Sequence, residues 1–129
     1  MHITALLPWQ YVTVRGPSMV PGLRDGDAVV VRHGAAIRAG DVVLARFATM
    51  PDRLVIKRAV RRDGDGWWLA SDNALAGGDS ASHGVADVLA LVTLRIRRGA
   101  APWRVSVRRV RTLPPPADVA DSTVRANPE

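Results

Sequence analysis

Two residues of this chain have the chemistry of a nucleophile and its base. Ser18 stands in Gly16-Pro17-Ser18-Met19-Val20-Pro21, a loop-forming stretch that can hold a hydroxyl exposed and fixed. Lys57 is the only lysine, and every other cationic side chain of the Lys/Arg type is arginine. Arginine keeps its proton in proteins, whereas a buried lysine can lose it. A neutral Lys57 amine is therefore expected to deprotonate Ser18, with the Ser18 N–H as the likeliest oxyanion donor.

The residues around Lys57 predict a strand that shields the amine from water. In Leu54-Val55-Ile56-Lys57-Arg58-Ala59-Val60, alternation puts Lys57 on the face of Val55 and Ala59, with Arg58 on the other face. Burial disfavours an ammonium and lowers its pKa. The alternative is a lysine whose stem packs while its head reaches water. For the Ser18 segment, the alternative is an ordinary turn between strands.

A polar, turn-prone segment follows, with Ser71-Asp72-Asn73, then Gly78-Asp79-Ser80, then His83-Gly84-Val85. By itself it predicts a surface loop. A Ser-His-Asp triad would need His2, His33 or His83, and of these only His83 has Ser and Asp nearby. Nothing in the spacing fixes triad geometry, so the Ser–Lys pair is favoured.

Short, valine-rich apolar runs separated by Gly and Asp predict a mostly β fold. Asp25-Gly26-Asp27, Ala39-Gly40-Asp41 and Asp63-Gly64-Asp65-Gly66 provide turn chemistry between them. Many short strands at this spacing suggest a barrel or a coiled, partly open sheet. The expected strands are Tyr11 to Val14, Ala28 to Arg32, Val42 to Phe47, Leu54 to Arg61, Trp67 to Ala70, Leu89 to Ile96 and Arg104 to Val110.

The overall composition suits one small domain. The chain has 129 residues, no cysteine and a formal charge of +6. We expect one domain over residues 1–113 and a flexible tail over 114–129, where a Pro-rich and then polar sequence offers little to bury. Absence of cysteine weakly favours the cytoplasm. No window approaches the roughly 18 apolar residues that a membrane span needs, so neither an anchor nor a secretion signal is expected.

Taken in order, these elements resemble the signal peptidase clan, which groups signal peptidase I with the self-cleaving SOS repressors. Gly16 to Pro21 matches Gly-x-Ser-Met-x-Pro, which carries the clan's nucleophile, and Lys57-Arg58-Ala59-Val60 matches Lys-Arg-x-Val, which carries its base. Ser71 to Asn73 and Asp79 to Gly84 match in part the Gly-Asp-Asn and Asp-Ser-Arg-x-x-Gly segment of the signal peptidase branch. The matches cover about residues 14–92, with arginine-rich strands after them over 93–111.

The resemblance implies roles for further residues. Gly16, Pro17, Met19 and Pro21 would form the oxyanion and substrate-binding loop, and a second set would support the dyad: Arg58, Asp72, Asn73, Asp79 and Ser80. The sequence departs from the usual pattern at Gly22, Ser71, Gly77 and Ala81, where Thr, Gly, Ser and Arg are usual. The Ser missing at 77 tends to position the lysine, and the Arg missing at 81 tends to pair with the Asp. The fold implied is the signal peptidase catalytic core, and the chemistry requires no metal or cofactor.

Within the clan, the chain looks most like the maturation peptidases of nickel-type superoxide dismutase. The likeness rests on the short length of the chain, on the Gly-Trp-Trp-Leu run from Gly66 to Leu69 and on the arginine-rich composition. It also rests on the 17 residues before Ser18, in which no membrane anchor is expected. Such enzymes are expected to remove an N-terminal leader from the dismutase precursor. Two alternatives stay open: processing of other precursors or of the chain itself, and a non-enzymatic basic β module. The module would bind nucleic acid or anionic membrane through the arginine-rich stretch 95–111.

Overall fold

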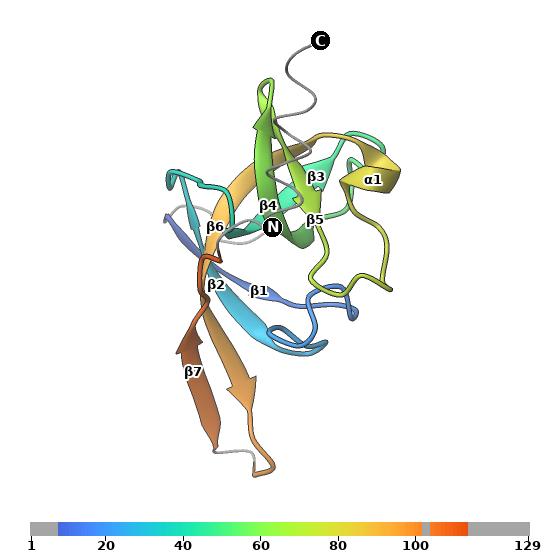
Figure 1. The fold of residues 1–129 in the computed structure, drawn as a ribbon. Coiled ribbons are helices and arrows are strands. Elements are labelled where there is room, and N and C mark those ends of the chain that lie inside the picture. Colours follow the sequence, from blue (N-terminus) through green and yellow to red (C-terminus); the bar gives the residue numbers. More distant parts are fainter. Residues whose placement is uncertain (1–7, 102–103, 114–129) are drawn as a thin grey trace.

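The computed structural model describes residues 8–101 and 104–113, which form seven antiparallel strands and one short helix (Figure 1). In chain order the elements are β1 (Trp9–Thr13), β2 (Ala28–His33), β3 (Val42–Phe47), β4 (Val55–Asp63), β5 (Gly66–Ala70), α1 (Ser80–His83), β6 (Ala86–Arg98) and β7 (Val105–Arg109). The mostly β prediction is confirmed.

The strands form one curved sheet in the order β1-β2-β6-β3-β4-β5. A further pairing of Trp67 in β5 with Ala86 in β6 bends this sheet into a partial ring that does not close into a barrel. Register shifts occur where β6 pairs with β2, between Val30 and Val31, and where it pairs with β3, between Leu44 and Ala45. Such bulges increase local twist and help a sheet to curl. The expected coiled, partly open sheet is the observed one.

Strand β6 organises the sheet because its length lets it pair with β2, β3, β5 and β7. Its last residues and β7 extend from the rest of the domain as a two-stranded ribbon (Figure 1). The sequence predicted a shorter strand, Leu89 to Ile96, whereas pairing with β3 already begins β6 at Ala86. Pairing with β7 continues the strand to Arg98.

Strand β3 lies between two apolar clusters. Val42 and Leu44 face one cluster, which also contains Met19 and Leu23 from the loop after β1. Val43 and Phe47, on the other face, pack in the second cluster. A strand buried on both faces needs a nearly continuous apolar run, which β3 has apart from the exposed Arg46, and its bounds were predicted correctly.

The other predicted strands are present with ends shifted by a few residues. The structure adds α1, a four-residue helix that the sequence analysis placed in a loop. In the part of the chain that the structure describes, no helix is long and apolar enough to cross a bilayer. The predicted tail over 114–129 lies outside the described residues, as do residues 1–7.

Phe47 is the largest fully buried side chain and should contribute strongly to stability. We expect Phe47→Ala to lower the free energy of unfolding by about 3–5 kcal/mol, because it removes apolar contacts and leaves a cavity. Urea denaturation followed by tryptophan fluorescence measures this change. Leu75→Ala, at a side chain that is 96% exposed, is the matched control and should stay within about 0.5 kcal/mol of the parent.

Candidate active site

Ser18 and Lys57 line the same cleft, which has a volume of about 470 Å³. The loop after β1 provides one wall, and β4 with the segment before it provides another. Residues 76–78 and His83 complete the lining. The cleft thus gathers three of the regions that the sequence analysis selected, although they lie far apart along the chain.

Local hydrogen bonds fix the loop that carries Ser18. Gly16 adopts φ +82°, a conformation that favours glycine, and its N–H donates to Asp25 Oδ1 at 2.8 Å. After the serine, Leu23 N–H donates to Met19 O at 3.0 Å, and the Met19 side chain is buried in the first cluster. The loop is anchored on both sides of Ser18, which remains partly exposed at the cleft.

Asn73 connects this loop to the polar segment after β5. Its backbone N–H donates to Ser18 O at 2.8 Å, and its side-chain Nδ2 donates to Pro17 O at 3.1 Å. Asn73, one of the predicted supporting residues, therefore holds the backbone of the nucleophile loop.

The backbone N–H of Ser18 has no hydrogen-bond acceptor among the residues that the structure describes. An amide at the edge of a cleft with no internal partner can donate to a ligand oxygen. The predicted oxyanion role of this amide requires a donor that is free in this way, and the role stays a prediction.

Lys57 lies in β4 with only 5% of its surface exposed. Burial lowers the pKa of its amine from the usual 10.5, and the nearby positive charge of Arg53 lowers it further. The carboxylate of Asp79 acts in the opposite direction but is outweighed. No carboxylate within the described ranges forms an ion pair with Lys57.

The Lys57 amine is instead held by a neutral hydroxyl, that of Ser71. Lys57 Nζ donates to Ser71 Oγ at 3.0 Å, and Ser71 Oγ donates to Gly77 O at 3.0 Å. Because the Ser71 proton is directed to Gly77, this hydroxyl can only accept from Lys57. When the Lys57 amine is neutral, its nitrogen lone pair is not used in the bond to Ser71 and is free to accept a hydrogen bond or a proton from another group. Within the described chain, no direct hydrogen bond joins Ser18 to Lys57.

The sequence analysis treated Ser71 only as a departure and did not assign it this contact. Two departures together carry the signal, because a hydroxyl is gained at 71 where Gly is usual and is missing at 77 where Ser is usual. Gly77 and Gly78 have φ of +65° and +71°, a path that a serine would adopt only with strain. The loop conformation explains why the hydroxyl beside Lys57 comes from position 71.

Arg58, next to the amine in sequence, points to the other face of the sheet as predicted. Its guanidinium pairs with both carboxylate oxygens of Asp72, at 3.0 and 2.6 Å, and donates to Gly40 O and Arg111 O. Arg58 and Asp72 thus support the loop and sheet around the cleft without touching Lys57.

Asp79 and Ser80 organise the short helix. Asp79 caps α1 by accepting from Ala81 N–H at 3.1 Å, while the buried Ser80 Oγ accepts from Leu69 N–H at 2.7 Å. Position 81 is Ala where the clan usually has an Arg that pairs with this carboxylate. In this chain the Asp79 carboxylate instead accepts from two backbone N–H groups, that of Ala81 and, at 3.5 Å, that of Ser71. Pro21, which follows a cis peptide bond and was predicted to belong to the substrate-binding loop, is exposed and does not line the cleft.

His83 also lines the cleft, although it forms no triad. Its Nδ1 bonds to Thr49 Oγ1 at 3.1 Å and its ring packs against Phe47. In the described part of the chain, neither Ser18 nor a carboxylate is hydrogen-bonded to it. Nor does any group of three or more His, Cys, Asp or Glu gather in a metal-binding arrangement among the described residues.

The comparison with known families gives the same assignment as the fold and the cleft. Residues 8–86, more than half of the chain, match the family described as Peptidase S24-like. The chain belongs to the Peptidase S24-like family. The matched region of this S24-like chain contains Ser18, Lys57, Ser71 and the cap residue Asp79.

A curated relative of the S24-like chain is described as "Mitochondrial ATP-independent inner membrane protease subunit 1a" from Arabidopsis thaliana. The two are 36% identical over 77 residues, which cover 56% of this chain and 46% of the relative. The chain therefore spans less than half the length of that curated relative. Both comparisons support a peptidase of signal peptidase-like type.

Removing the buried amine should stabilise the protein. The folded state lowers the Lys57 pKa, so between that pKa and 10.5 the unfolded chain binds more protons and stability rises with pH. Lys57→Met should raise the free energy of unfolding by about 1 kcal/mol at neutral pH. This gain should shrink as the pH approaches 10.5, where half of the unfolded chains have already lost the Lys57 proton.

Urea denaturation of both proteins from pH 7 to 10.5 measures this difference. Arg46→Met, at an exposed cation of β3, is the matched control and should give a small difference in stability without this pH dependence. A Lys57→Met protein that is less stable than the parent at every pH would contradict the assigned desolvation.

Proposed function

We propose that this chain is a serine endopeptidase in which Ser18 is the nucleophile and Lys57 the general base. The observation that carries the proposal is the state of the Lys57 amine in the cleft it shares with Ser18. The amine is almost completely buried, its pKa is lowered, and its bonded partner is a neutral hydroxyl rather than a carboxylate. These conditions favour an unprotonated amine near neutral pH.

In the proposed reaction, Lys57 Nζ accepts the Ser18 proton while Ser18 Oγ bonds to the scissile carbonyl carbon. The Ser18 N–H donates to the developing oxyanion. Lys57 then gives the proton to the leaving amine, the peptide C–N bond breaks, and an ester to Ser18 remains. A water attacks this ester, gives its proton to Lys57, and releases the new carboxylate as Ser18 regains its proton. Catalytic hydrogen bonds often tighten only with substrate present, and the Ser18–Lys57 contact is expected to form then.

An extended substrate would bind by adding a strand beside β1. Among the described strands β1 pairs only with β2, so its outer edge is available for main-chain hydrogen bonds. The strand leads directly to Gly16 and Ser18, and residues Val12 to Val14 already line the cleft. A peptide aligned there would present its carbonyl groups to Ser18.

For the substrate, we propose a precursor protein in the cytoplasm whose N-terminal leader is removed, and specifically the precursor of nickel-type superoxide dismutase. The support is the resemblance carried by the motifs, the Gly66 to Leu69 run and the arginine-rich composition. No cofactor is needed for this hydrolysis.

Co-expression with a nickel dismutase precursor tests the reaction and the substrate together. The parent chain should release the leader and expose one new N-terminus, which N-terminal sequencing identifies. Ser18→Ala and Lys57→Met should each lower the cleavage rate by at least about 10³-fold, because each removes one member of a unit. Ser82→Ala, at an exposed serine of α1, is the matched control and should cleave like the parent.

The two parts of the proposal fail in different ways. Undiminished cleavage by Ser18→Ala would falsify the serine mechanism. Cleavage of other extended peptides by the parent chain, with the dismutase precursor left intact, would remove only the substrate assignment.

The contact from Ser71 predicts a positioning role that can be separated from stability. Ser71→Ala should lower kcat roughly 10²-fold with little change in KM, because Ser71 holds the base and does not touch substrate. Ser71→Thr keeps the hydroxyl and should retain activity within a few-fold. In the parent, activity should rise with pH to a midpoint below 10.5 as Lys57 is deprotonated.

Steady-state kinetics across pH, with urea denaturation of each variant, provides the test. A loss of kcat in Ser71→Ala without a matching loss of stability supports positioning of Lys57. Equal kcat in Ser71→Ala and the parent would show that the base is held by other groups.

A further inference from the structure

A second cavity of about 200 Å³ lies on the side of the Ser18 loop where β7 and the residues after it approach β4. Apolar side chains, Leu23 and Val42 among them, form part of its lining. The charged part of its lining contains one carboxylate, that of Asp72, and five guanidinium groups from β4, β6 and the segment around β7: Arg58, Arg95, Arg108, Arg109 and Arg111. The reaction proposed above uses none of these five arginines as an acid, base or nucleophile.

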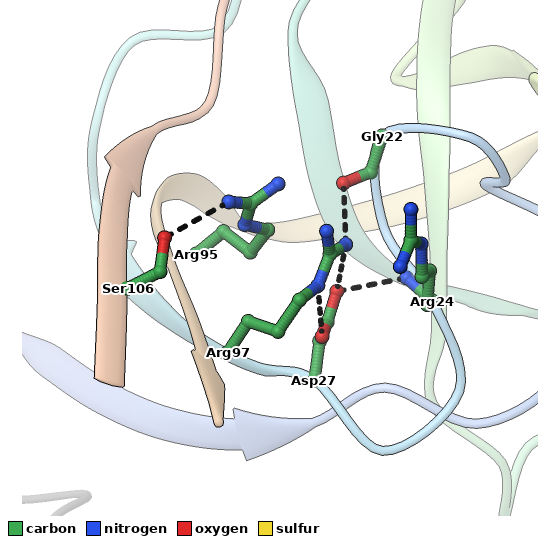
Figure 2. A network of polar contacts seen from close by, with 6 residues as sticks. All are labelled: Gly22, Arg24, Asp27, Arg95, Arg97 and Ser106. Carbon is green, nitrogen blue, oxygen red and sulfur yellow. Dashed lines mark hydrogen bonds and ion pairs between the residues drawn. The ribbon is translucent and has the colours of Figure 1, made fainter. Parts of the chain in front are cut away.

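The nearby carboxylates are already engaged by other groups. Asp27 binds Arg97 through both oxygens at 2.8 Å and also accepts from the N–H of Arg24 (Figure 2). Asp72 is paired in the same two-point way with Arg58. These are the two ion pairs that the described part of the chain contains. Four of the five arginines of the cavity therefore have no carboxylate partner among the described residues.

Arg95 is the most constrained of these four cations. It lies directly opposite Arg108 in the register of β6 and β7, and like charges at opposed positions destabilise a sheet. Its Nη2 reaches Ser106 Oγ at 3.3 Å, as Figure 2 shows, while its buried Nε has no hydrogen-bond partner within the described chain. Burial lowers the pKa of Arg95, and the charges of Arg97 and Arg108 lower it further.

We propose that this cavity binds a phosphate oxyanion, through Arg95 and Arg108 with Arg109 and Arg111 at its rim. The planar guanidinium fork matches the oxygen spacing of a phosphate group. A phosphate with close to two negative charges would offset the repulsion between Arg95 and Arg108. The Asp27 carboxylate also acts favourably on the charge of Arg95, but both of its oxygens are bound by Arg97. The apolar lining leaves room for a compact carbon group, so the phosphate can be a free ion or part of a monoester.

Calorimetric titration of the full chain with inorganic phosphate and with phenyl phosphate, at constant ionic strength, tests this site. We expect saturable binding with one site per chain. Arg95→Gln should weaken it at least tenfold and Arg108→Gln several-fold, whereas Arg46→Gln, with the same loss of charge outside the cavity, should bind like the parent. Arg108 is exposed, so its variant should fold normally even if the Arg95 variant does not.

Tighter binding of phenyl phosphate than of inorganic phosphate would support a monoester as the ligand, and equal binding would support the free ion. The proposal is overturned by a heat signal that does not saturate, or by equal weakening in Arg46→Gln and Arg108→Gln. Either result would mean that the arginines attract anions only through the net charge of the protein. Because the measurement is binding rather than cleavage, it stands apart from the proposed peptidase activity.

Discussion

The site depends on one contact, the hydrogen bond from the Lys57 amine to the Ser71 hydroxyl. A buried amine needs a partner, yet a carboxylate would stabilise its charged form and keep the proton in place. A hydroxyl whose own proton is directed to a backbone carbonyl satisfies the amine without adding a negative charge. The surrounding loop, with two glycines in left-handed conformations, brings that carbonyl within reach.

The sheet provides the burial on which this contact relies. Strand β3 is covered on both faces, and β4 pairs with it so that Val43 lies beside Lys57. The segment between β5 and β6 places α1 beside β5, where the Ser80 hydroxyl accepts from the backbone N–H of Leu69. The catalytic candidates therefore lie in a cleft between the sheet and the loops that carry Ser18 and Gly77.

Much of the fold could be predicted because the signals were local. Val42 to Phe47 is apolar except for the exposed Arg46, and alternation along Val55 to Ala59 placed Lys57 on the covered face. The length of β6 was underestimated at both ends, because Ala86 to Val88 become strand through pairing with β3, and Arg97 and Arg98 through pairing with β7. Helix α1 has four residues, too few for a periodic pattern, and its start depends on the Asp79 cap.

The candidate site was predictable in its members but not in its connections. Ser18 and Lys57 could be selected from residue type and motif, and the structure places both on one cleft. The departures at positions 71 and 77 hint at the contact of Ser71 with Lys57, but the contact itself depends on the backbone path through Gly77 and Gly78. In the same way, only the register of β6 and β7 places Arg95 opposite Arg108. Both arginines lack a carboxylate partner in the described chain because Asp27 and Asp72 are paired with Arg97 and Arg58.

Asn73 links the two loops of the site through its side chain and its backbone at once. The loop with Ser18 and the loop with Ser71 consequently lose their conformational freedom together when the chain folds. That entropy is lost once, during folding, and not again at each encounter with a peptide. The cleft is thus preorganised, and the ordering that remains on binding falls mainly on the substrate strand.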